Sequence, residues 1–284
     1  MSKVFIFCDG GFGNRFNALI SGLFLAQCCN KEPLVIWPIN TKTGASFTDL
    51  FHTNIKEYNN FDHETFWQDH NPLNIIHWNP WKKEVEWHNA MGIYMGIDQF
   101  VNSFGDRNIL FTSSLLCPWV DTNGLKPVLD LVPFHDFLYS NAKEFINANF
   151  DSEEFYGLHI RKTDHAYQLD EQKYIEIIKN NQDKKYFICS DDKDTEDIFK
   201  SISKNVKVFP KSNYVEKEIE EGGWQTMVFD EFGNGFPFNI KRNKQSVLEA
   251  MVDLLVLSYS SIINQDQRST FLQTALLFKK YRNM

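Results

Sequence analysis

The chain of 284 residues carries a formal net charge of -8 at pH 7, and 43% of its residues are hydrophobic. This length and composition are typical of a globular protein with one large domain or two ordinary ones. The negative charge and the scattered basic residues do not fit a general nucleic-acid binder, which needs a basic stripe. No apolar segment approaches the roughly 18 residues of a membrane span. We therefore expect neither nucleic-acid binding nor a transmembrane segment, and an anionic ligand would need a local basic pocket.

The cysteines and the aromatic residues support further expectations. The five cysteines are an odd set without the spacing of a zinc site, and the adjacent Cys28 and Cys29 are poor disulfide partners. We expect reduced cysteines, no metal centre and a cytoplasmic protein. The aromatic share of 15% is expected mainly to pack the core and interfaces rather than to form sugar-stacking surfaces.

The first half of the sequence predicts a Rossmann-like opening. Residues 4–8 form a short apolar run, a glycine-rich turn follows, and Leu19, Leu23 and Ala26 have helical spacing. A second apolar run at 34–37 completes a βαβ unit with parallel strands. Residues 50–125 have weak periodicity, and we expect short strands and irregular loops there.

The second half repeats the alternation of strands and helices. Residues 135–149 have helical spacing and end at an acidic stretch, so the domain boundary is placed near 150, giving domains 1–150 and 151–284. Strands are predicted at 155–161, 186–189, 206–209 and 261–263, helices at 171–181, 194–202, 246–257 and 269–280, and a long excursion at 211–245. The predicted fold is α/β, with two Rossmann-like domains facing a cleft.

The sequence Gly-Leu-His-Ile-Arg-Lys-Thr-Asp at 157–164 ends an apolar strand in charged residues. Side chains alternate along a strand, so His159 and Arg161 share one face while Leu158 and Ile160 share the other. The planar guanidinium of Arg161 suits a diphosphate because it can bind two oxygens at once. On its own the motif is also compatible with a buried ion pair between Arg161 and Asp164.

A second candidate segment is Asp-Gly-Gly-Phe-Gly-Asn-Arg at 9–15, between the first strand and the first helix. Small residues there let the backbone approach a ligand, and a helix N-terminus attracts anions. The spacing matches neither the dinucleotide-binding fingerprint nor a P-loop. The alternative interpretation is a tight turn in which Asn14 caps the helix.

Other polar residues stand at strand ends or inside an apolar helix. The segment after the strand at 186–189 contains Asp192 and Asp194, which could cap a helix, contact a ribose or chelate a metal ion. Asp253 lies within an apolar helical stretch and should have a partner, because an unpaired buried carboxylate is costly. Ser269 opens the last helix, where capping and phosphate binding are compatible.

Taken together, these segments resemble the GT-B inverting fucosyltransferases, the superfamily of core α1,6-fucosyltransferases, the rhizobial chitooligosaccharide enzyme and protein O-fucosyltransferases. The resemblance rests on Gly-Gly-Phe-Gly-Asn-Arg at 10–15, Ser-Phe-Thr-Asp-Leu-Phe at 46–51, His-Ile-Arg-Lys-Thr-Asp at 159–164, Ser-Asp at 190–191, Asp-Leu-Leu-Val-Leu-Ser at 253–258 and Ser-Thr-Phe at 269–271. It spans nearly the whole chain. One departure is Lys162, where the family commonly has arginine.

The resemblance implies roles for individual residues. Arg161 would hold the diphosphate of GDP-fucose, and His159 would reach the nucleoside. Asp253 would read guanine. The remaining residues expected at the nucleotide-sugar site are Gly11, Gly13, Asn14, Arg15, Ser190, Ser269, Thr270 and Phe271; of these, Asn14 and Arg15 would line the cleft near the sugar, and Ser269 and Thr270 would contact phosphate.

The reaction implied is inverting, metal-independent transfer of fucose from GDP-fucose to a hydroxyl of an oligosaccharide or glycan. The candidate general bases are Asp9, Asp170 and Glu171, each of which could instead be a surface or capping carboxylate. The alternatives left open are a transferase of the same fold with another nucleotide sugar, a non-catalytic glycan- or nucleotide-binding protein, and a metal-dependent transferase that uses Asp192 and Asp194.

Overall fold

The structure is a computed structural model. It describes residues 2–59, 66, 74–78, 105–113, 116–117, 120, 122–151, 153–163, 170–229, 235–236, 238–263 and 269–282. Asp164, the last residue of the charged motif, and much of the expected irregular region at 50–125 lie outside these residues. The chain forms two compact units, Met1–Pro38 with Ser46–Phe134 and Ile39–Ala45 with His135–Met284, which are called unit 1 and unit 2.

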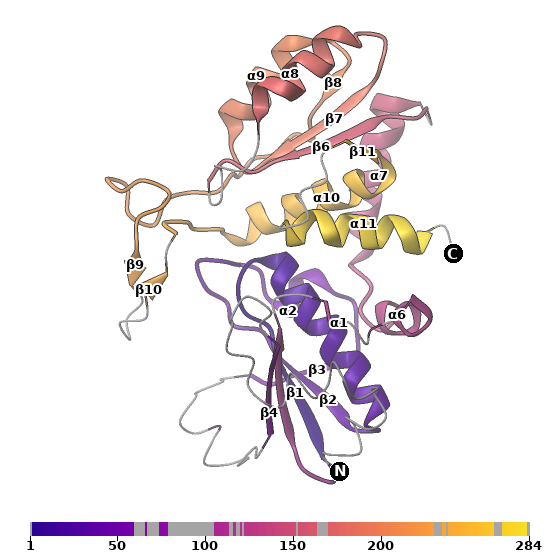
Figure 1. Ribbon diagram of the computed structural model, residues 1–284, viewed down its shortest axis with the longest axis vertical. Coiled ribbons are helices and arrows are strands. Elements are labelled where there is room, and N and C mark those ends of the chain that lie inside the picture. The colour runs from indigo at the N-terminus through magenta and orange to yellow at the C-terminus, as the bar shows by residue number, and fades with distance from the viewer. Residues whose placement is uncertain are drawn as a thin grey trace. The chain divides into compact units, whose positions relative to one another are not determined.

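Unit 1 is built on a five-stranded sheet in the order β3-β2-β1-β5-β4, with every neighbouring pair parallel. Its strands are β1 (Lys3–Phe7), β2 (Glu32–Ile36), β3 (Lys56–Glu57), β4 (Asn74–Trp78) and β5 (Ile109–Ser113). The helices described here are α1 (Phe12–Cys28), α2 (Phe47–Leu50) and α6 (Thr122–Leu129). Helix α1 packs on β1, β2 and β5 (Figure 1). The predicted βαβ opening is confirmed.

The aromatic residues of unit 1 form a core rather than a surface. Phe51 lies 5.2 Å from Phe47 and 5.2 Å from Phe134 between ring centroids, and Trp37 packs against both Phe47 and Phe51. Trp37, Phe47, Phe51 and Phe134 are all buried. The segment that begins at Ser46 starts α2 with a capping box, in which the Ser46 hydroxyl accepts from the Asp49 amide at 3.1 Å. This part of the fucosyltransferase-like pattern therefore packs the core.

Unit 2 is built on a parallel four-stranded sheet in the order β11-β6-β7-β8. Its strands are β6 (Tyr156–Ile160), β7 (Tyr186–Ser190), β8 (Val206–Lys207) and β11 (Ser261–Ile262), and its helices are α7 (Asp136–Phe150), α8 (Glu171–Asn180), α9 (Lys193–Ile202), α10 (Lys244–Tyr259) and α11 (Thr270–Arg282). Helices α8 and α9 cover one face, and α7, α10 and α11 lie on the other (Figure 1). The predicted alternation is therefore found throughout this unit.

The division between the units differs from the boundary expected near residue 150. Helix α7 precedes that position but belongs to unit 2, because it packs along α10. Phe145 of α7 also contacts Phe187 of β7, with ring centroids 5.6 Å apart. Composition marks the end of α7, but it does not show on which sheet the helix packs.

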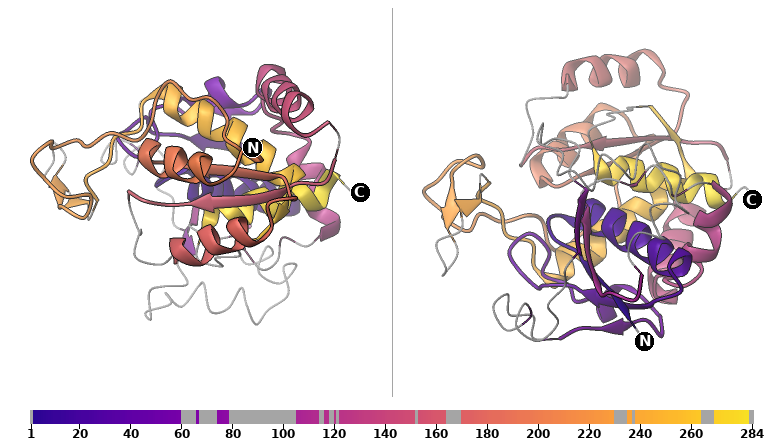
Figure 2. Two further views of the ribbon diagram at one scale, coloured as in Figure 1. Left: turned by 90° about the horizontal axis from the view of Figure 1, so that it is seen from above. Right: turned by 60° about the horizontal axis from the view of Figure 1, so that its bottom comes forward.

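Between β8 and α10 the chain makes the expected long excursion, residues 211–243. It carries a two-stranded antiparallel ribbon of β9 (Val228–Phe229) and β10 (Gly235–Phe236). Figure 2 shows in two further views that this ribbon stands out from the sheet of unit 2. The buried Asn239 side chain accepts from the Ile219 amide and donates to the Ile219 carbonyl, both at 2.7 Å. The Asn239 side chain thus fixes the base of the excursion, because it binds both backbone groups of Ile219 as a neighbouring strand would.

Gly157 is required by the close approach of β6 to the end of α10. A Cβ at this position would lie 2.0 Å from Ser260 Oγ and 2.9 Å from Ser260 Cβ. We expect Gly157→Ala to destabilise the protein by about 1–3 kcal/mol, as overpacking of a core does, measured by urea unfolding. Gly223→Ala is the control, because its new Cβ would meet only Thr226 Oγ1 at 3.9 Å. Equal stability of the two variants would contradict this account.

Candidate functional site

The topology of unit 2 places a candidate ligand site at the carboxyl edge of its sheet. The chain passes from β6 to β7 and β8 on one side and returns with β11 on the other side of β6. In open parallel sheets, ligands bind outside the carboxyl ends of the strands at such a reversal. Arg161 directly follows β6. The helix after β11 begins at Thr270, and Ser269 is the residue before it. Segments that are far apart in sequence therefore belong to one sheet edge.

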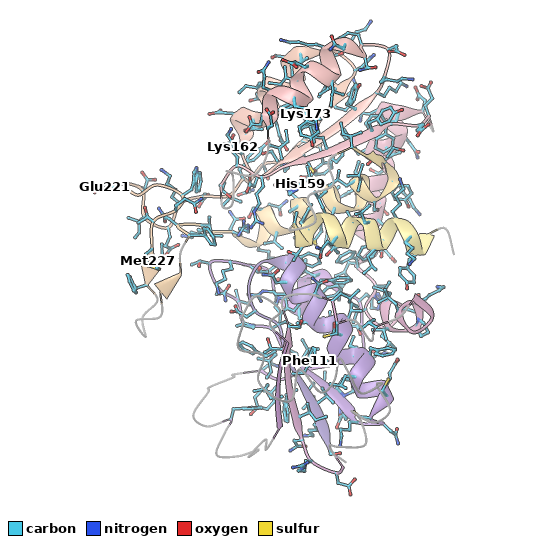
Figure 3. All side chains as sticks on the ribbon, viewed as in Figure 1. Phe111, His159, Lys162, Lys173, Glu221 and Met227 are labelled. Carbon is cyan, nitrogen blue, oxygen red and sulfur yellow. The ribbon has the colours of Figure 1, made fainter. Side chains whose placement is uncertain are left out.

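The alternation predicted for the motif strand is confirmed. Leu158 and Ile160 are fully buried in a cluster with Ile178 of α8 and Phe199 of α9. His159 faces the opposite side of the sheet, where its ring stacks on Phe271 with centroids 4.8 Å apart and planes 27° apart. Figure 3 labels His159 on this strand. The stack brings the motif strand and the start of α11 into direct contact.

Ser269, Thr270 and Phe271 form the start of α11. Ser269 is buried, and its hydroxyl accepts a hydrogen bond from the Leu272 amide at 3.3 Å. The Thr270 carbonyl accepts from the Thr274 hydroxyl at 2.8 Å. Ser269 therefore caps the helix in this structure, as the simpler interpretation of the sequence had it.

The candidate bases of unit 2 both have structural contacts. Asp170 is the N-cap of α8, and its carboxylate accepts from the Lys173 amide at 3.3 Å. Glu171 forms an ion pair with Lys162, the residue that follows Arg161. Glu171 thus lies against the motif loop, whereas Asp170 is exposed at the start of the helix.

Asp253 has the partner that its burial requires, and that partner is Lys211. Lys211 Nζ donates to Asp253 Oδ2 at 2.8 Å, forms an ion pair with Glu196, and donates to the Ser190 carbonyl at 2.7 Å. Burial raises the pKa of Asp253 to about 7, against the lowering effect of Lys211. Asp253 Oδ1 is buried, with no hydrogen-bond partner in the part of the chain that the structure describes.

Lys211 and Glu196 were not anticipated from the sequence. Burial alone would lower the pKa of Lys211, but the charges of Asp253 and Glu196 together raise it. Burial raises the pKa of Glu196, which also accepts from the Tyr214 hydroxyl at 2.7 Å. This buried charge cluster, Lys211, Glu196 and Asp253, holds β7, α9 and α10 together, so Asp253 has a structural role whatever else it contacts.

The residues after β7 divide into separate structural roles. Ser190 is buried, and its amide donates to Glu196 Oε1 at 2.8 Å. Asp192 is the N-cap of α9, and its carboxylate accepts from the amide and the hydroxyl of Thr195 at 2.9 and 2.6 Å. Asp194 is exposed in the first turn of α9. Asp192 thus caps a helix, the first of the alternatives considered for it.

In unit 1 the glycine-rich loop also lies at a reversal of strand order, because β1 separates β2 from β5. Gly10 has a φ of 88°, a backbone angle that residues with a side chain rarely adopt. Gly11, not Asn14, is the N-cap of α1, without a side-chain capping bond, and a Cβ on Gly11 would meet nothing within 4 Å. Gly13 is buried and Asn14 half-buried in the first turn of α1.

Arg15 differs from its expected position at a ligand cleft. Its side chain is fully buried, donates to the Gly10 carbonyl at 2.7 Å and the Pro38 carbonyl at 2.6 Å, and lies over the Trp37 ring. Burial lowers its pKa to about 10, and the nearby half-buried Asp9 opposes that shift. In this structure Arg15 stabilises the glycine-rich loop through its hydrogen bond to the Gly10 carbonyl.

Three further properties concern the described residues alone. Within them, no group of three or more His, Cys, Asp or Glu side chains could hold a metal ion. No helix in the same ranges is long and apolar enough to cross a membrane. All five cysteines lie within these ranges and are free thiols.

Two α/β units, each with a parallel sheet and a polar loop at its strand-order reversal, define a fold of the GT-B type. NodZ alpha-1,6-fucosyltransferase co-crystallised with GDP matches with a TM-score of 0.60 and 16% identity, over 98% of this chain and 92% of that chain. NodZ from Bradyrhizobium matches with a TM-score of 0.60 and 14% identity over the same shares. POFUT1 in complex with GDP-fucose matches with a TM-score of 0.52 and 12% identity, over 96% of this chain and 93% of that chain.

At these identities the likeness shows the fold. No protein-family profile and no curated protein sequence matches the chain. The chain therefore has the GT-B fold of the fucosyltransferase NodZ and of POFUT1, as the sequence motifs predicted.

Proposed function

We propose that the chain is an inverting glycosyltransferase that transfers fucose from GDP-fucose to a hydroxyl group of an oligosaccharide or glycan, without a metal ion. The observation that carries this proposal is the His159–Phe271 stack at the strand-order reversal of unit 2. It joins the strand that delivers Arg161 to the helix that begins at Thr270. The solved structures of the same fold were obtained with GDP or GDP-fucose.

In the proposed reaction an acceptor hydroxyl attacks the anomeric carbon as GDP leaves, through an oxocarbenium-like transition state. Negative charge then accumulates on the β-phosphate. The Arg161 guanidinium can bind two phosphate oxygens and stabilise this charge, with Ser269 and Thr270 as further donors. His159 contacts the nucleoside, and the unpartnered Asp253 Oδ1 accepts from guanine. These contacts would stabilise the departing GDP without a metal ion.

Residues of unit 1 have a less direct part in the proposal. Gly11, Gly13 and Asn14, at the N-cap and in the first turn of α1, contact the ligand, and Arg15 holds the shape of the glycine-rich loop. The base that removes the acceptor proton is one of Asp9 of unit 1, which follows β1, and Asp170 and Glu171 of unit 2, which stand at the start of α8. The acceptor is an oligosaccharide or glycan with a free hydroxyl group.

Calorimetric titration of the full chain with GDP, UDP and GDP-fucose, with and without a divalent metal ion, tests the donor. We expect GDP and GDP-fucose each to bind as tightly in EDTA as in the presence of the metal ion. We expect UDP to bind at least tenfold more weakly than GDP, since a base pocket with buried polar groups rejects the wrong base. Binding of UDP in preference to GDP would assign another donor. Binding that needs the metal ion would favour the metal-dependent alternative, and GDP binding without transfer to any glycan would favour a binding protein.

A further inference from the structure

The backbone that follows Arg161 is held by a carboxylate from the neighbouring strand. The Lys162 amide donates to Asp191 Oδ1 at 2.7 Å, and the Thr163 amide donates to Asp191 Oδ2 at 3.4 Å. The Thr163 hydroxyl also donates to Asp191 Oδ2. Asp191 therefore receives hydrogen bonds from both residues that come directly after Arg161.

This arrangement continues the sheet beyond its last strand pair. The parallel register of β6 and β7 ends with Ile160 opposite Ser190, and Asp191 is the next residue after β7. Past that point the Lys162 amide is bound by the Asp191 side chain. Because hydrogen bonds to an ionised carboxylate are stronger than neutral ones, Asp191 fixes the direction of the chain as it leaves the sheet.

The same loop is also held from two other elements. Gln225 of the excursion donates from Nε2 to the Thr163 carbonyl at 3.3 Å. Lys162 forms its ion pair with Glu171 at the start of α8, and Figure 3 labels Lys162 at this end of the sheet. Thr163 is only 1% exposed. The backbone amide, the side-chain hydroxyl and the backbone carbonyl of Thr163 are thus all hydrogen-bonded within unit 2.

We infer that Asp191 and Gln225 are positioning residues for Arg161, which hold the two peptide units after it and so fix where its guanidinium meets the diphosphate. This inference rests on the proposed function, since it takes Arg161 to bind phosphate. Asp191 supplies the main restraint, through its hydrogen bonds to Lys162 and Thr163. Gln225 links the excursion to the same loop.

The neighbouring residue provides a matched control. Asp192 is adjacent in sequence and carries the same charge, but its carboxylate binds the amide and hydroxyl of Thr195 at the start of α9. Its substitution removes a helix cap and leaves the hydrogen bonds of the motif loop in place. Any difference between variants at 191 and 192 therefore reports the loop restraint and not the loss of a negative charge near β7.

The test is GDP affinity measured by calorimetry for wild type, Asp191→Asn, Asp192→Asn, Arg161→Lys and the double variant Arg161→Lys with Asp191→Asn. Asparagine keeps the size of the side chain but turns an NH2 group toward the Thr163 donors. We expect Asp191→Asn to weaken GDP binding by about tenfold and Asp192→Asn by less than about twofold. If Asp191 acts through Arg161, Asp191→Asn should have a clearly smaller effect once Arg161 is lysine, because less of the phosphate contact is left to position.

Two results would overturn the inference: Asp191→Asn binding GDP like wild type, or its effect adding in full to that of Arg161→Lys. If Asp191→Asn does not fold, as judged by circular dichroism, Thr163→Val and Gln225→Ala replace it, with an expected loss of about threefold each. Unchanged affinity in both would also overturn the inference. Failure of the wild type to bind GDP would instead reject the proposed donor.

Discussion

Replacing Arg161 with alanine is expected to lower the rate of fucosyl transfer by about 100-fold or more, because loss of one donor to a charge that develops in the transition state typically costs that much. Arg161 directly follows β6, and the strand packs through Leu158 and Ile160 rather than through the arginine. The core is therefore untouched by the substitution, and the variant should fold as wild type does.

The measurement is transfer of fucose from GDP-fucose, followed by product mass spectrometry over a panel of acceptor glycans, with circular dichroism as the folding check. Arg161→Lys should fall between wild type and Arg161→Ala, because an ammonium group keeps the charge but not the two-pronged geometry. Arg107→Ala, at an exposed arginine of unit 1, is the matched control and should transfer at the wild-type rate. Near-normal turnover of Arg161→Ala would remove the central role assigned to this residue.

The elements that could be predicted from the sequence are those whose hydrophobic pattern is local. The strand that carries His159 and leads to Arg161 is recognisable because Leu158 and Ile160 alternate with them, and the structure buries Leu158 and Ile160 beneath α8 and α9. Helix α10 was predicted at 246–257 and extends over Lys244–Tyr259. For these segments the local pattern and the tertiary packing agree.

Contacts between distant residues could not be predicted in the same way. Lys211 lies 42 positions from Asp253 and 15 from Glu196, so no spacing rule joins them. Arg15 stands in a loop motif that suggests ligand binding, yet its donors are bound by the carbonyls of Gly10 and Pro38. Burial of a charged group depends on which carbonyls and carboxylates the fold brings to it, and this is decided by the sheet order.

Replacement of Lys211 by methionine is expected to destabilise the protein by about 3–5 kcal/mol, because it leaves two buried carboxylates without their counter-ion. The Lys211 side chain is 4% exposed, and those of Glu196 and Asp253 are 1% and 5% exposed. Lys193→Met is the control within the same unit, because the Lys193–Asp197 pair is solvent-exposed and such pairs add little to stability. The control should unfold at the same urea concentration as wild type.

The loss of stability in Lys211→Met should depend on pH in a direction that the buried charges set. Lys211 lowers the pKa of both Glu196 and Asp253, and burial raises it, so without the lysine both values move further above those of the unfolded chain. The folded variant then binds more protons than the unfolded one, and its stability rises as pH falls. Urea unfolding at pH 6 and pH 8 should therefore show the larger deficit at pH 8.

Adding Asp253→Asn to Lys211→Met should recover part of that deficit, because an uncharged amide is cheaper to bury than an unpaired carboxylate. A deficit equal at both pH values, or unchanged by the second substitution, would mean that lost packing and not unpaired charge limits the variant.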